Sequence, residues 1–317
     1  MRRARPFNRS LRTKTLMETL EALRRQIHTT RRLRSVVRTM KVLSLTSIRQ
    51  AERAVESLGA YDQTVQLGLQ AAVRGRQRLP SVLRGGAPRL RPTAAIVIGS
   101  TWGMCGRFNE QLAESVAEEI PGAGSETALL LAIGEYIGGP LERHGRVPDA
   151  HAVAPESVEG ITRRVEDLLL RIEAWQREED IDRLLLFYNE RTTGSGYDVR
   201  VRQLLPLDYE WLQGLQEAPW PTNMLPGFRT DWQELFSALV REYLFVSLHR
   251  AFAESLASEH SSRLAAMQRA ETNVEERLHA LSQRFHRKRQ TAMTEEVLDI
   301  MAGFEALQPT RDASGKN

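Results

Sequence analysis

The segment at residues 99–109, GSTWGMCGRFN, contains residue types that could bind a phosphate group or hold a nucleophile. It follows an apolar run of strand type and precedes a helical stretch, which is where phosphate-binding loops occur. Its glycine spacing matches neither the dinucleotide fingerprint nor the P-loop pattern, and the P-loop lysine is absent. We therefore favour a tight strand-to-helix turn, in which Gly103 and Gly106 adopt backbone angles open to glycine. Nucleotide binding is the minor alternative.

Cys105, the single cysteine of the chain, lies in this turn. A nucleophile needs a base within hydrogen-bond reach, and no sequence pattern supplies one, so we expect a small buried side chain. The seven histidines show no metal-ligand spacing. His260 falls on an apolar helical stripe, where a packed core histidine is the simpler interpretation. We predict no catalytic residue, no cofactor and no metal site.

The strongest electrostatic feature is a basic block at the start of the chain. Residues 1–53 hold 15 arginine and lysine residues against three glutamates, a net charge of +12, and the whole chain carries +4, so the remainder carries −8. Such a block pairs with nucleic acid, anionic lipid or an acidic protein surface. No aromatic residues are interleaved for base stacking. A charged coiled-coil face and an acidic protein partner both remain open. The block is densest at Arg31, Arg32, Arg34, Arg38 and Lys41.

Two long helices are predicted to carry most of these residues. Residues 16–73 lack proline, and their apolar residues recur at steps of three and four, which predicts a helix over residues 17–75. The same pattern predicts a second helix over residues 230–307. Two such helices most simply bury their stripes on each other as an antiparallel coiled coil. Capping-box spacing marks both starts, at Thr15 with Glu18 and at Thr230 with Gln233.

Between these helices the hydrophobic period changes to that of an α/β domain. Residues 76–93 are rich in Arg, Gly and Pro and indicate a linker. Within residues 94–207, short apolar runs alternate with helical stretches, which predicts a mainly parallel sheet with helices on its faces. Residues 197–207 alternate and indicate an edge strand. Residues 208–229 are expected to be an irregular connection. The other strands are expected at AAIVIG, TALLLAIG, AHAVA and DRLLLFYNE, and the helices near residues 109–120, 135–144 and 160–178.

The two ends of the chain have their own composition. Residues 1–16 carry basic side chains and no acid, as transit peptides do, and a disordered extension or a true start at Met17 are the alternatives. Residues 308–317 are expected to be a tail. No stretch approaches the roughly 20 apolar residues of a membrane span, so we expect a protein that is soluble or attached to a membrane through partners.

Three stretches resemble one known family: RRQIHTTRRLRSVVRTMKVLSLTSIRQAE, GSTWGMCGRFN, and SLASEHSSRLAAMQRAETNVEERL followed by RKRQTAMTEEVLDIMAGFEAL. Together they are similar to the gamma subunit, the central rotating shaft, of F-type rotary ATP synthases, over nearly all of residues 17–307. RQLLPL at residues 202–207 is similar as well. The resemblance implies a mixed fold, α+β or α/β, in which a long antiparallel coiled coil of the terminal helices carries a central Rossmann-like α/β domain.

The implied function is mechanical and needs no active site or cofactor in this chain. Ion flow would turn a membrane ring, the ring would turn the shaft, and the shaft would drive ATP synthesis or hydrolysis in the catalytic head. The implied partners are the alpha and beta subunits, an epsilon-like subunit and the membrane c-ring, without nucleic acid. The implied location is peripheral, on the cytoplasmic face of a bacterial inner membrane, or on the mitochondrial matrix side if residues 1–16 are a transit peptide.

The resemblance also assigns rotor–stator coupling contacts by position. Met40 falls on the residue of the N-terminal helix that faces an acidic loop of a beta subunit. Arg263 and Glu259 fall on the C-terminal shaft. The residues that fall where the shaft engages the catalytic ring are Gln290, Thr294 and Glu296.

The chain departs from the family pattern at its central turn. Thr101 and Trp102 stand where the family usually has Asp-Arg, and Met104 and Arg107 alter the Gly-Leu-Cys-Gly-Gly turn. These departures indicate a divergent branch, such as an alternative ATPase. Two other functions compete with this interpretation. A P-loop ATPase with a coiled-coil arm lacks its Walker A sequence, and a coiled-coil nucleic-acid or scaffold adaptor would explain residues 1–53 but not the C-terminal motif.

Overall fold

The computed structural model describes residues 7–74, 93–120, 128–192, 196–224 and 226–307. The chain divides into two compact units, which we call the helical unit (Met1–Met40 with Met267–Asn317) and the α/β unit (Lys41–Ala266). Two long helices, α1 (Phe7–Arg74) and α6 (Trp232–Leu307), contribute residues to both units. The predicted tail lies outside the described residues, and so does the predicted linker apart from Thr93.

The α/β unit contains a five-stranded sheet. Its order is β3-β2-β1-β4-β5, in which β3, β2, β1 and β4 run parallel and β5 pairs antiparallel with β4 at one edge. This arrangement confirms the predicted mainly parallel sheet and its edge strand. The strands are β1 (Thr93–Ile98), β2 (Ala128–Ile133), β3 (Ala150–Ala152), β4 (Arg183–Arg191) and β5 (Tyr197–Leu205).

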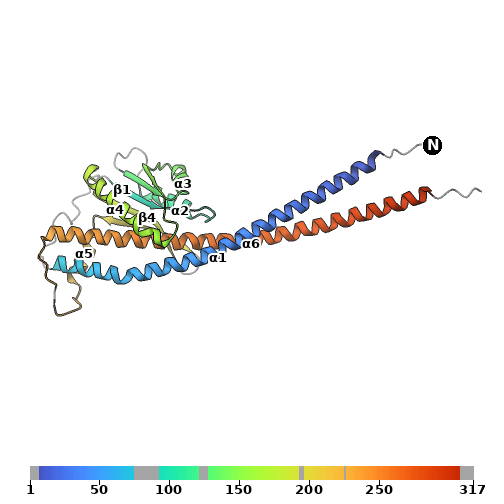
Figure 1. Cartoon of the computed structure of the whole chain (residues 1–317). Coiled ribbons are helices and arrows are strands. Elements are labelled where there is room, and N and C mark those ends of the chain that lie inside the picture. Colours follow the sequence, from blue (N-terminus) through green and yellow to red (C-terminus); the bar gives the residue numbers. More distant parts are fainter. Residues whose placement is uncertain (1–6, 75–92, 121–127, 193–195, 225, 308–317) are drawn as a thin grey trace, which may run out of the picture. The chain divides into compact units, whose positions relative to one another are not determined.

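Alternating residues of the central strands build two separate cores, because successive side chains of a strand point to opposite faces. Ala95 and Val97 of β1 pack with α2 (Phe108–Glu119) and α3 (Gly138–Arg143). Ile96 and Ile98 face α4 (Ile161–Glu178) together with parts of α1 and α6. The strands and the shorter helices therefore gather beside the part of α6 drawn in orange in Figure 1.

The helical unit is held by a small apolar seam. Leu23 and Ile27 of α1 pack against Val274, Leu278, Leu281 and Phe285 of α6, whose steps of four, three and four are those of a coiled coil. Farther along α1, Arg38 bonds Glu271 at 2.7 Å and Glu275 at 3.0 Å. Later residues of α1 thus meet earlier residues of α6, which confirms the antiparallel pairing. Among the described residues, no helix combines the length and apolar character needed to cross a bilayer.

The helix starts differ from the predicted ones. Helix α1 begins at Phe7, so the start predicted at Thr15 and Glu18 lies within the helix. At α6 the cap is Asp231 rather than Thr230, because the Asp231 carboxylate accepts the backbone N–H of Gln233 at 2.8 Å.

The segment predicted as an irregular connection contains a further helix, α5 (Tyr209–Glu217). The side chain of Asp208 accepts the backbone N–H groups of Glu210 and Trp211, which caps the first turn. Leu212, fully buried, fixes the helix to the core. This local cap explains why a proline-rich stretch still supports a helix.

Candidate functional site

The turn after β1 adopts the left-handed backbone conformation at two positions. These are Met104, at a φ of 61°, and Gly106, at a φ of 64°. The expectation that Gly103 would supply the first of them is wrong. A Cβ at Gly103 would lie 3.3 Å from the ring of Tyr136, which is a tight contact.

This turn lies at the topological switch point of the sheet. After β1 the chain builds β2 and β3 on one side and then places β4 on the other side of β1. Ligands of open α/β sheets bind at the carboxyl ends of the strands beside such a point. The position is therefore the first place to look for a bound anion.

Two backbone amides of the turn bond a carboxylate of this chain. The N–H groups of Thr101 and Trp102 donate to the two oxygens of Glu259 at 3.1 and 3.3 Å. Glu259 lies on α6, and its side chain is 4% exposed. An internal carboxylate thus accepts from two of the backbone amides that this turn could offer to an anion.

Arg263, one helical turn beyond Glu259, completes the contact. Its guanidinium donates to the Glu259 carboxylate, to the Trp102 carbonyl at 2.9 Å and to the Gly103 carbonyl at 3.3 Å. Its side chain is 5% exposed. A buried ion pair is tolerated when further hydrogen bonds satisfy both partners, and both partners have them here.

Two serines of α6 extend the same contact. The Ser262 hydroxyl donates to the Cys105 carbonyl at 2.5 Å, and the Ser255 hydroxyl to the Ile98 carbonyl at 3.4 Å. We call residues 98–106 and the α6 residues bonded to them the turn anchor. Sequence reasoning missed it, although the small polar run in LASEHSSR, which interrupts an otherwise apolar stripe, was a usable signal. The α6 members of the anchor are Ser255, Glu259, Ser262 and Arg263.

Cys105 behaves as a structural side chain of this turn. It is buried, and its thiol lies 3.6 Å from the Ser100 hydroxyl. Burial raises the pKa of the Cys105 thiol, which is the opposite of the lowered pKa of reactive cysteines. Asn109 braces the turn, donating to the Ser100 hydroxyl at 2.8 Å and accepting the Ser100 N–H at 2.9 Å.

The six coupling residues predicted by resemblance divide between the two units. Glu259 and Arg263 are buried in the turn anchor of the α/β unit, so in this chain their side chains offer little surface for a direct partner contact. Met40, in the helical unit, is half-buried on α1. Gln290, Thr294 and Glu296 are exposed on α6, and the Thr294 hydroxyl donates to the Gln290 carbonyl at 2.9 Å.

An exposed apolar stripe accompanies the last three of these residues. Met293, Val297, Met301 and Phe304 follow one another at helical spacing, and each is more than half exposed. Sequence reasoning placed this end of α6 on a buried seam. Large exposed apolar patches are typical of interaction surfaces.

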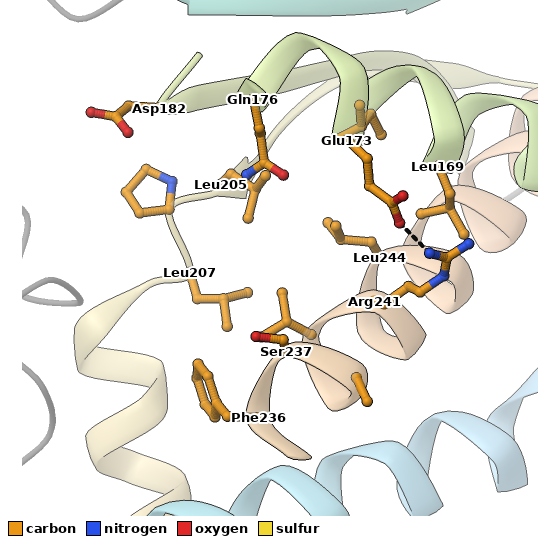
Figure 2. A pocket seen from close by; sticks show the side chains of 14 residues that line it. Leu169, Glu173, Gln176, Asp182, Leu205, Leu207, Phe236, Ser237, Arg241 and Leu244 are labelled. Carbon is orange, nitrogen blue, oxygen red and sulfur yellow. Dashed lines mark hydrogen bonds and ion pairs between the residues drawn. The ribbon is translucent and has the colours of Figure 1, made fainter. Parts of the chain in front are cut away.

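The α/β unit also contains a cavity of about 630 Å³ between α4, α6 and the segment after β5. Figure 2 shows leucines 169, 205, 207 and 244 and Phe236 directed into it. Its principal charged groups, Glu173 and Arg241, bond each other across the edge and so join α4 to α6. The cavity is thus an apolar groove between packed helices whose main charges are already paired.

Comparison with known proteins gives a consistent result. The family described as ATP synthase matches residues 19–307. The ATP synthase gamma chain of Anaeromyxobacter sp. (strain K) is 29% identical over 306 residues, which cover 92% of this chain and 100% of that protein. The gamma chain of Roseobacter denitrificans is 26% identical with the same coverage.

Solved structures agree in fold. A chain of the Euglena gracilis mitochondrial ATP synthase, in an OSCP/F1/c-ring structure, superposes with a TM-score of 0.66 at 14% identity. The superposition covers 95% of this chain and 98% of that one. A chain of the Tetrahymena thermophila central stalk and c-ring gives a TM-score of 0.53 at 20% identity, covering 74% and 99%.

Proposed function

The chain belongs to the ATP synthase gamma chain family and has the role of a central stalk subunit in a rotary ATP synthase, and we propose how its parts perform that role. The observation that carries the proposal is the turn anchor. A rotor must turn as one body, and the anchor bonds α6 to the sheet through both charged and neutral groups. Glu259 and Arg263 then act as positioning residues within the rotor. This role takes the place of the direct stator contacts that the resemblance implied for them.

The helical unit is the part proposed to work inside the catalytic head of alpha and beta subunits. Arg31 and Arg32 are exposed on α1 and present positive charge to acidic loops of the head. The exposed stripe from Met293 to Phe304 supplies an apolar contact surface on α6. Met40, Gln290, Thr294 and Glu296 are proposed to contact the head from these same two helices.

The chain itself is proposed to be non-catalytic. Glu259 fills the amides of the only turn whose position in the sequence suggested phosphate binding, so ATP would bind to the partner subunits. Isothermal titration of the purified chain with ATP is expected to give no saturable heat. Saturable binding that disappears when Gly106 is replaced would contradict this part of the proposal.

The remaining partners follow from the same role. We propose that the chain also binds an epsilon-like subunit and the membrane c-ring, which would hold it at the cytoplasmic face of a bacterial inner membrane. The membrane attachment would then come entirely from partners.

Co-purification tests the proposal as a whole. A tagged copy of the full chain, expressed in its own host, is expected to retain alpha and beta ATPase subunits, with ATP hydrolysis in the retained complex. A matched copy lacking residues 290–307 is expected to lose much of that hydrolysis. Retention of nucleic acid without ATPase subunits would contradict the proposal and favour the adaptor function.

A further inference from the structure

Two carboxylates and an imidazole lie together on the α2 and α3 side of the sheet. Glu110 and Glu114 are one helical turn apart on α2, so they project from the same helix face. His144 follows the end of α3. One ligand atom from each of the three lies within 4.8 Å of the others, and Glu110 Oε1 lies 3.2 Å from His144 Nε2. Sequence spacing could not reveal the cluster, because Glu110 and His144 are 34 positions apart.

The neighbouring arginines hold the outer side of this cluster. Arg143 donates to Oε2 of Glu110 at 2.7 Å, which leaves Oε1 directed toward His144. Arg107 donates to Oε1 of Glu114 at 3.0 Å. Carboxylates that ligate metals commonly have such an outer hydrogen-bond partner. Both arginine side chains are exposed, so these ion pairs are weak competitors for the carboxylates.

The elements under the cluster fix its spacing. Leu112 and Ala113 of α2 are fully buried in the same core as Leu141 of α3. Just after His144, the Arg146 guanidinium donates to the carbonyls of Ala117 and Ile120 at the end of α2, at 2.8 and 2.5 Å. The segment that presents the imidazole is therefore tied to the helix that presents the carboxylates.

The chemistry of the three groups suits one class of ligand. One imidazole nitrogen with two carboxylate oxygens is a donor set for zinc and related divalent transition metals.

We propose that Glu110, Glu114 and His144 bind one divalent transition-metal ion, with zinc as the reference ion. Arg143 and Arg107 hold the outer carboxylate oxygens. The ion joins α2 to the end of α3 and so stabilises this edge of the α/β unit. The proposed metal site is independent of the rotary role. A chain that binds no metal could still act as the central stalk.

Isothermal titration of the full-length, metal-free chain with zinc chloride tests the proposal. One ion per chain is expected to bind. Glu110→Gln and His144→Ala are each expected to weaken binding at least ~10-fold, since even outer partners of metal ligands contribute ~10- to 100-fold. Cobalt gives a second readout, because visible absorption bands of a low-symmetry site should appear in the wild type and be lost in both variants. The matched control is His279→Ala, which removes an exposed histidine on α6.

Glu110→Gln preserves the shape of the side chain, so it separates loss of a ligand from loss of the fold. Thermal melting without metal checks that it folds as the wild type does. Zinc is expected to raise the melting temperature of the wild type and of His279→Ala, and not that of Glu110→Gln. Equal zinc affinity in the wild type, Glu110→Gln and His144→Ala, or no binding by the wild type, would overturn the proposal.

Discussion

At the residue scale, the buried pair of Glu259 and Arg263 shows how a fold that can bind nucleotides becomes a mechanical part. Two amides of the turn after β1 hold a carboxylate from α6, and the guanidinium beside it bonds two carbonyls of the same turn. Neither residue needs to touch a partner subunit to matter for rotation. Each fixes the turn to the helix, and the cost of losing either is therefore a cost in stability.

Removing Arg263 tests this interpretation. Arg263→Ala leaves the Glu259 carboxylate buried without its counter-charge, and breaking one side of a buried ion pair costs about 3–5 kcal/mol of unfolding free energy. Urea unfolding followed by tryptophan fluorescence measures it, since all five tryptophans lie in the α/β unit. Arg200→Ala, which breaks an exposed pair with Glu190, is the control and should change the midpoint little. Equal shifts of the urea midpoint in the two variants would contradict a structural role for the anchor.

His260 gives the anchor a pH dependence. Burial and the adjacent Arg263 guanidinium lower the pKa of His260 to about 4, from an ordinary value of 6.5. The unfolded chain therefore takes up a proton between pH 6.5 and 4 that the folded chain does not, so stability falls as pH falls through this range. His260→Asn keeps an acceptor toward Arg263 without a titrating group.

The expected difference is on the order of 2–3 kcal/mol. Between pH 7 and pH 4 the wild type should lose this much more unfolding free energy than the variant loses. Urea unfolding at both pH values measures it. Because Glu259 and the other carboxylates titrate in both proteins, parallel pH profiles of wild type and variant would show that the imidazole is not responsible.

At the element scale, periodic segments were predictable and long-range partners were not. Local apolar patterns predicted β1, β2 and β4 within a few positions. The helix α4, which buries five apolar residues on one face, was predicted equally closely. Helix α5 was missed because one aspartate cap outweighed the surrounding prolines. The partner of Glu259 lies more than 150 positions away in sequence, at Thr101 and Trp102, so no local pattern could identify it.

The seam of the helical unit gives an element-scale prediction. Its buried apolar residues among those described are few, so each contributes a large share of the pairing between α1 and α6. Leu278→Ala should cost about 2–3 kcal/mol, the lower part of the range for buried leucines, because the seam is narrow and the side chain keeps 9% of its exposure. Amide hydrogen exchange should accelerate in residues 267–285 and stay unchanged in the sheet. Val297→Ala, which truncates an exposed side chain on the same helix, should leave the exchange of both regions at wild-type rates.

At the scale of the whole molecule, the charge is distributed unevenly along the sequence. The first 53 residues carry a net charge of +12, whereas the rest of the chain carries −8. Within the described part of the helical unit, Arg38 is paired internally, because it bonds Glu271 and Glu275. Arg31 and Arg32 are exposed, and we propose that their charge faces an acidic surface of the catalytic head.

Reversing that charge tests the whole-molecule proposal. Arg31→Glu with Arg32→Glu places four units of charge change on an exposed face of α1, and like charges across an interface are strongly unfavourable. Assembly with the alpha and beta subunits should weaken at least ~10-fold, or ~1.4 kcal/mol, at low ionic strength. Added salt should reduce the difference in assembly between the variant and the wild type, since salt screens exposed charges. Co-purification yield and ATP hydrolysis of the complex provide the two measurements.

Two control variants separate this interface effect from general ones. Arg163→Glu with Arg171→Glu makes the same charge change on exposed positions of α4 and should assemble like the wild type. Arg38→Glu removes the internal bonds to Glu271 and Glu275, so it should loosen the helix pair at every salt concentration, unlike the interface variant. A charge-reversed chain that assembled and turned over normally, and lost only binding to nucleic acid, would mean that the basic block serves an adaptor and not a rotor.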